Sequence, residues 1–135
     1  TASQRGHGQS ILIVEDHRQV RAIMAESLAN AGYHVIQACD GAEALDVLRA
    51  ATQPVHLVIL DVDLPKIDGP SCLVAMREVN PSQQALLISG LANRASIAAT
   101  LPDEDVLAKP FSMSQLLAAV HERCTASSRE GERLK

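Results

Sequence analysis

The sequence is nearly devoid of aromatic residues, with one Tyr, one Phe and no Trp among 135 residues. Hydrophobic residues nevertheless make up 47% of the chain. A folded core must therefore be built from aliphatic side chains. A chain of this length suits one domain, which can bury roughly two-thirds of the surface of its unfolded state.

Other absences restrict the function. There is no excess of basic residues, and the net charge of −4 argues against direct binding of nucleic acid. No apolar run is long enough to span a membrane, and the first residues lack the apolar core of a signal peptide, so we expect no membrane contact by this domain. No glycine-rich fingerprint follows the first apolar run, which disfavours dinucleotide binding.

The three cysteines, Cys39, Cys72 and Cys124, form no CxxC pair and no Cys/His cluster. We interpret them as reduced thiols, and therefore expect a cytoplasmic location and no metal bound by cysteine.

Apolar runs alternate with stretches of helical spacing along the chain. The predicted strands are residues 11–14, 35–36, 57–60, 85–88 and 106–108, and the predicted helices are residues 20–31, 42–48, 70–79, 94–100 and 113–124. In the third helix we expect Cys72, Met76 and Val79 to face inward. Five alternations predict a single α/β domain with a doubly wound parallel sheet and right-handed crossovers. We expect a flexible leader or linker at residues 1–9, the domain at 10–125 and a charged tail at 126–135.

The third apolar run, residues 57–60, has the pattern of a strand that is buried on both faces. It ends in Asp61 and Asp63, and Pro65 and the turn at residues 68–70 bar the strand from continuing. Open α/β sheets bind their ligands at the carboxyl ends of their strands, which is where Asp61 is expected.

Polar residues follow four of the five predicted strands. They are Glu15 and Asp16, then Asp61 and Asp63, then Ser89, and finally Lys109. In a parallel sheet all of these strand ends lie on one edge. At about 4 Å and an effective dielectric constant near 20, each like-charge pair costs roughly 4 kcal/mol, so either some of these carboxyls are protonated or a cation joins them. Mg²⁺, a small hard ion that takes oxygen ligands, is the natural solution. A carboxylate beside a metal, with a hydroxyl and an ammonium to hold an anion, predicts a phosphoryl site in which an aspartate is the nucleophile.

These motifs together resemble the receiver domain of two-component response regulators. The matching features, over about residues 10–125, are Glu15-Asp16 after a strand, Asp40-Gly41-Ala-Glu-Ala-Leu45, Asp61 followed by Leu64-Pro65 and Asp68-Gly69, Ser89-Gly90, and Lys109-Pro110-Phe111. The resemblance implies a flavodoxin-like (βα)5 fold with a five-stranded parallel sheet of order 2-1-3-4-5.

The resemblance also implies a role for each matched residue. Asp61 would accept a phosphoryl group from the phosphohistidine of a histidine kinase or phosphotransfer domain. Asp16 and Asp61 would hold Mg²⁺ together with the backbone carbonyl of Asp63. Glu15 would act through a water molecule or as an acid beside these direct ligands. Ser89 would bond a phosphoryl oxygen and swing toward it on activation. Lys109 would pair with the phosphate, and the peptide bond that follows it would be cis. Such a domain phosphorylates and dephosphorylates itself but is no turnover enzyme, and its signal would pass to an output domain or a homodimer.

Two positions depart from the common pattern of the family. Val106 stands where a Tyr or Phe often changes rotamer on activation. Asp63 adds a carboxyl beside the phosphorylation site, either as a solvated loop acid or as an influence on phosphoryl lifetime. We discount the remaining candidates for three reasons. His17 is expected on the surface, in the first turn of a helix, and His34, His56 and His121 are scattered without ligand spacing. Lys66 and Arg94 could border the pocket, but solvation at the surface is favoured.

Two other functions remain open at this stage. The Asp61-Val62-Asp63 sequence imitates the motif of haloacid-dehalogenase-type phosphatases, although there it usually follows the first strand. A receiver-like interaction module that works without phosphorylation is the second alternative. The parent protein could be a stand-alone regulator, a transcription factor or a hybrid histidine kinase. The residues that make up the motifs favour the hybrid kinase.

Overall fold

Five parallel strands form one sheet in the computed structural model, which describes residues 6–63, 69–90, 95, 97–99, 101 and 103–133. The strands are β1 (Ser10–Val14), β2 (His34–Ala38), β3 (Leu57–Asp61), β4 (Ala85–Ser89) and β5 (Asp105–Ala108). Their order in the sheet is β2-β1-β3-β4-β5. The predicted α/β fold and strand order are confirmed.

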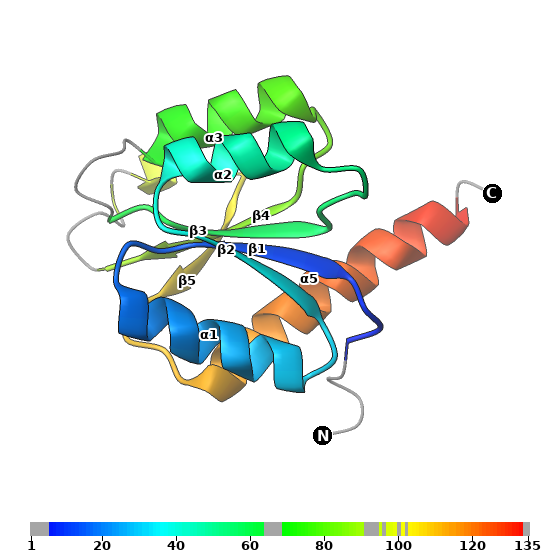
Figure 1. Ribbon diagram of the computed structural model, residues 1–135, viewed down its shortest axis with the longest axis horizontal. Helices are drawn as coiled ribbons and strands as arrows, with labels where there is room; N and C mark the ends of the chain where they lie inside the picture. The colour runs from blue at the N-terminus through cyan, green and yellow to red at the C-terminus, as the bar shows by residue number, and fades with distance from the viewer. Residues whose placement is uncertain are drawn as a thin grey trace.

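Helices cover both faces of this sheet (Figure 1). They are α1 (Arg18–Asn30), α2 (Gly41–Ala50), α3 (Gly69–Val79) and α5 (Met113–Arg133). Helices α2 and α3 lie on one face, and α1 and α5 lie on the other. In the described part of the chain, no helix is both long and apolar enough to cross a membrane.

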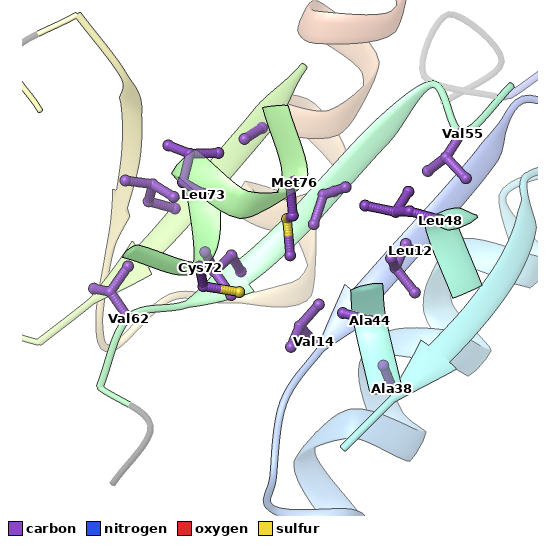
Figure 2. Close-up of a cluster of buried hydrophobic side chains, with 14 of the residues drawn as sticks. Leu12, Val14, Ala38, Ala44, Leu48, Val55, Val62, Cys72, Leu73 and Met76 are labelled. Atoms are coloured by element: carbon purple, nitrogen blue, oxygen red, sulfur yellow. The ribbon is translucent and has the colours of Figure 1, made fainter. Parts of the chain in front are cut away.

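The inner strands are apolar except for one polar residue at an end of each, because successive side chains enter opposite layers. Leu12 of β1 and Leu60 of β3 pack under α2 and α3, where Met76 is fully buried (Figure 2). The alternate residues Ile13 and Ile59 pack under α1 and α5. An aliphatic layer thus packs on each face of the sheet, and β2 and β5 are its edge strands.

Local signals in the sequence explain where the helices begin and end. Asp40 caps α2 by accepting a hydrogen bond from the Glu43 N–H at 2.8 Å. Ser112 and Gln115 form a capping box at the start of α5, with reciprocal bonds of 3.1 and 2.8 Å. Gly32 follows α1 at a φ of 101°, a conformation that favours glycine.

Some predictions differ from the structure or lie outside it. Val79 was expected to face inward, which is wrong: it is 36% exposed, because it is the last residue of α3. At the N-terminus, the Gly6 and Gly8 N–H groups donate to the carbonyls of Ala31 and Gly32, so residues 6–9 lie against the turn after α1. The helix backbone of α5 continues to Arg133.

Several residues used in the sequence argument lie outside the described ranges. They are Leu64, Pro65, Lys66, Asp68 and Arg94, together with residues 96 and 100 of the predicted fourth helix. Ala95 and residues 97–99 of that helix are helical, and Ile97 is buried against the α2–α3 layer.

The first turn of α3 depends on close packing at Gly69. A Cβ atom built on Gly69 would lie 2.7 Å from Cγ1 of Val62, too near for an unstrained contact. We predict that Gly69→Ala lowers the free energy of unfolding by about 1–3 kcal/mol in urea denaturation. Val74→Ala is the matched control, because Val74 is 58% exposed on the same helix and should change stability by less than about 0.5 kcal/mol. Equal stabilities of the Gly69 variant and the parent would contradict this packing.

Candidate functional site

The carboxyl ends of the strands meet at a cavity of about 630 Å³. One side is polar and is lined by Glu15 and Asp16 after β1, Asp61 and Asp63 at and after β3, and Lys109 after β5. The other side is mainly apolar and is lined by residues of α1 and of the connection from β5 to α5. These are Val20, Ile23, Met24, Pro110, Phe111 and Met113. The predicted acids and the lysine therefore come together as expected.

Asp61 is the last residue of β3 and is only 3% exposed. Its Oδ1 atom accepts the Asp63 N–H at 2.9 Å, and its Oδ2 atom accepts a hydrogen bond from Lys109 Nζ at 2.9 Å. Both carboxylate oxygens are thereby oriented, and the side chain still lines the cavity.

Lys109 joins two carboxylates, because its Nζ atom also lies 3.1 Å from Oδ2 of Asp63. Burial by itself lowers the pKa of the ammonium, but the hydrogen bonds to Asp61 and Asp63 outweigh burial, so the net pKa of Lys109 is raised above 10.5. The Lys109 ammonium is therefore charged at neutral pH. The Lys109–Pro110 peptide bond is cis, as the family resemblance led us to expect.

Glu15 is buried beside Asp61, with 5% of its surface exposed. Burial is the main cause that raises the pKa of Glu15 from 4.5 to about 8. A hydrogen bond with Asp61 and repulsion by the Asp61 charge raise it further. Its Oε1 atom accepts the His17 N–H at 3.0 Å. His17 itself is exposed and caps α1, with Nδ1 accepting the Val20 N–H at 3.3 Å, and it also lines the cavity.

The carboxylates could hold a hard cation only with help from water. No three acidic, histidine or cysteine side chains in the described ranges converge closely enough to form a complete metal cage. Mg²⁺ commonly takes one or two carboxylates and keeps several waters, so a partial site suits it. The oxygen ligands available, the exposed position of Asp16 and the repulsion between Glu15 and Asp61 all fit such an ion.

Ser89 is fully buried at the end of β4, and its hydroxyl donates to the Gly90 carbonyl at 3.1 Å. It does not line the cavity with the other expected residues. Val106 is 40% exposed in β5.

Sequence reasoning missed two features of the site. The first is the bond from the Gly90 N–H to Oδ2 of Asp63, at 2.8 Å. The second is the apolar side of the cavity, where Val20 and Ile23 are 40% and 54% exposed. Their helical spacing with Met24 and Leu28 was visible in the sequence, but spacing alone does not separate a buried face from a docking face.

Comparison with known proteins identifies this arrangement of strands and acids. The sequence model of the response regulator receiver domain matches residues 11–121. The chain belongs to the response regulator receiver domain family. This assignment is consistent with two-component signalling, and domains of this family interact with histidine kinases or phosphotransfer proteins.

Similar receiver domains occur in proteins of different architecture. The chain is 36% identical over 116 residues to the sensor kinase CckA of Brucella abortus, covering 84% of this chain but 12% of that kinase. It is 34% identical over 116 residues to a probable chemotaxis protein CheY of Rhizobium etli, covering 82% of this chain and 88% of that protein.

Solved structures agree with the sequence comparison. A response regulator receiver protein from Sinorhizobium medicae superposes with a TM-score of 0.77 at 28% identity, covering 88% of this chain and 96% of that one. The receiver domain of the hybrid histidine kinase CckA superposes with a TM-score of 0.71 at 30% identity, covering 85% of this chain and 98% of that one.

The raised pKa of Glu15 generates a stability prediction. Between 4.5 and about 8 the folded state holds a proton that the unfolded state releases, so without metal the stability of the parent should fall as pH rises through this window. Glu15→Gln removes the charge and keeps an oxygen for the His17 N–H. At pH ~8.5 without metal, it should raise the free energy of unfolding by about 1–3 kcal/mol, with little effect near pH ~5.

Urea denaturation at both pH values, with and without Mg²⁺, measures this effect. Glu78→Gln, at an exposed position of α3, is the control. Mg²⁺ should reduce the advantage of the Glu15 variant. An equal gain at both pH values would contradict the assigned cause.

Proposed function

We propose that this domain takes a phosphoryl group from phosphohistidine onto Asp61 and changes conformation in response. The observation that supports this most directly is the oriented Asp61 carboxylate, 3% exposed and 2.9 Å from the Lys109 ammonium at a cavity. A buried carboxylate whose nearest cation is already in place is suited to accept an anionic group.

The transfer is a displacement at phosphorus. An Asp61 oxygen forms a bond to phosphorus as the P–N bond to the donor imidazole breaks, and the electron pair remains on that nitrogen. Lys109 neutralises charge on the phosphoryl oxygens, which it can reach because it already lies beside the attacking carboxylate. Ser89 would first have to release the Gly90 carbonyl before its hydroxyl could bond a phosphoryl oxygen.

Mg²⁺ would supply further neutralisation of the transferring group when bound. Glu15, Asp16, Asp61 and the backbone carbonyl of Asp63 are the groups that would hold it.

The donor protein is expected to dock on the apolar side of the cavity. Its phosphorus must come within about 3–3.5 Å of an Asp61 oxygen, so the donor must cover the opening beside α1. Ile23, 54% exposed, and Val20, 40% exposed, give that rim an apolar surface. A histidine kinase or phosphotransfer domain that presents apolar side chains around its histidine fits this surface.

The rival functions are less well supported. Asp61 ends the third strand of a receiver fold, whereas the phosphatase motif usually follows the first strand. Glu15, Asp61 and Lys109 are all present in the site, which disfavours a module that works without phosphorylation. Similarity to a kinase receiver and to a chemotaxis regulator is compatible with either parent architecture, and we retain the hybrid kinase as the proposal.

Asp61→Asn should abolish labelling by radioactive acetyl phosphate while leaving the circular dichroism spectrum unchanged. Labelling of the parent should require Mg²⁺ and should be lost in hydroxylamine, as an acyl phosphate is. Asp46→Asn, at an exposed position of α2, is the control and should label like the parent. Undiminished labelling of Asp61→Asn would overturn the assignment of the acceptor. Multiple turnover of a generic phosphate ester would instead favour a phosphatase.

Ile23→Glu should slow transfer from a phosphorylated histidine kinase by on the order of tenfold, because a charge at an apolar contact is costly to desolvate. The rate of labelling by acetyl phosphate should remain that of the parent, since this small donor needs no docking surface. Val74→Glu is the matched control, at a position 58% exposed on α3, on the other face of the sheet. An equal loss in both variants would show that α1 is not the docking surface.

A further inference from the structure

One oxygen atom of Asp63 accepts hydrogen bonds from two different strand ends. Its Oδ2 atom lies 2.8 Å from the N–H of Gly90, which follows β4, and 3.1 Å from Nζ of Lys109, which follows β5. The Asp63 N–H is itself bonded to Oδ1 of Asp61 at 2.9 Å. Asp63 therefore links the acceptor aspartate to the ends of β4 and β5.

The groups that bind Asp63 lie at strand ends beside Asp61, because Lys109 bonds Asp61 directly and Gly90 comes two residues after Ile88, which pairs with Asp61. Lys109 is the only lysine or arginine among the described residues that line the cavity, and the same ammonium bonds Asp61 at 2.9 Å. The Gly90 N–H is a backbone donor fixed by the end of β4. A phosphoryl group brings more negative charge and more acceptor oxygens than the carboxylate it modifies, so it needs both kinds of donor.

A carboxylate oxygen resembles a phosphoryl oxygen in size, in charge and in the donors that it attracts. While Oδ2 of Asp63 accepts hydrogen bonds from the Lys109 ammonium and the Gly90 N–H, neither donor can form a full-strength hydrogen bond to an incoming phosphoryl oxygen. A second negative carboxylate also repels the incoming anion at close range.

We propose, on the basis of the function proposed above, that the Asp63 carboxylate is an internal competitor of the phosphoryl group. In the unphosphorylated domain it occupies the Lys109 ammonium and the Gly90 N–H. Phosphorylation of Asp61 requires Asp63 to release both. Asp63 thus sets the phosphorylation rate of this receiver and holds the residue after β4 in its resting position.

The first experiment needs no phosphoryl donor. Amide hydrogen exchange and the ¹⁵N–¹H shift of Gly90 are measured in the parent, Asp63→Asn and Asp63→Ala. The Ala variant has no side-chain acceptor, so Gly90 should exchange on the order of tenfold faster. The Asn variant keeps an acceptor oxygen and should lie between the two. Identical exchange and shift in all three proteins would overturn the proposal.

The second experiment measures phosphorylation by acetyl phosphate and binding of beryllofluoride at saturating Mg²⁺. Asp63→Ala should be phosphorylated on the order of tenfold faster than the parent and should bind beryllofluoride correspondingly more tightly. Asp63→Asn, which frees Lys109 but can still hold Gly90, should show a smaller gain. Rates and affinities that are equal to or lower than those of the parent would overturn the proposal.

Two controls separate local competition from other causes. Glu43→Gln removes an exposed acid from α2 and should leave the rate unchanged. The gain in Asp63→Ala should persist at high salt, because screening weakens long-range repulsion of acetyl phosphate but not a direct contact. A gain that disappears at high salt would count against the proposal. If the parent is not labelled at all, the proposed function fails, whereas a labelled parent with an unchanged Ala variant refutes only the competition.

Discussion

The Lys109 ammonium is the interaction on which the arrangement of the site depends. Two carboxylates at about 4 Å would repel each other by roughly 4 kcal/mol at an effective dielectric constant near 20. Lys109 lies within 3.1 Å of an oxygen of both Asp61 and Asp63 and offsets that repulsion. Its position is fixed by the sheet, because Ala108 pairs with Ser89 and the Lys109 N–H donates to the Ser89 carbonyl at 3.0 Å. The register of β4 and β5 therefore positions the Lys109 ammonium, which offsets the repulsion between Asp61 and Asp63.

Most of the fold could be predicted because the three inner strands bury both faces. Their sequences are continuous aliphatic runs, and the helices between them carry clear capping and turn residues. The edge strand β2 was predicted only at residues 35–36, yet it extends from His34 to Ala38. Its polar residues, His34 and Gln37, are exposed, but their backbones still pair with β1. A prediction from the side-chain pattern alone therefore makes an edge strand too short.

The members of the site could be predicted, but not how their side chains bond. Parallel topology brings strand ends to one edge whatever the rotamers, so Glu15, Asp61 and Lys109 follow from the order of the elements. The Asp63 side chain accepts a hydrogen bond from the Gly90 N–H, and the Ser89 hydroxyl donates to the Gly90 carbonyl. Such contacts depend on rotamers and local backbone geometry, which one sequence does not encode in any periodic pattern. The contacts of the Asp63 carboxylate with Gly90 and Lys109 could likewise not be predicted from the sequence.

The same contacts suggest how a change at Asp61 could reach the rest of the domain. The chain between β4 and β5 is anchored near both ends. At Gly90 the anchor is Asp63, which belongs to the site, and at Glu104 it is Arg77 of α3, whose Nη2 atom lies 2.8 Å from Oε1 of Glu104. Arg77 is also bonded to the Gln83 carbonyl and does not line the cavity. If phosphorylation displaces Asp63, it releases the first anchor and leaves the second in place. Coupling of this kind needs only an element with two arrangements, and it does not require an aromatic ring at position 106.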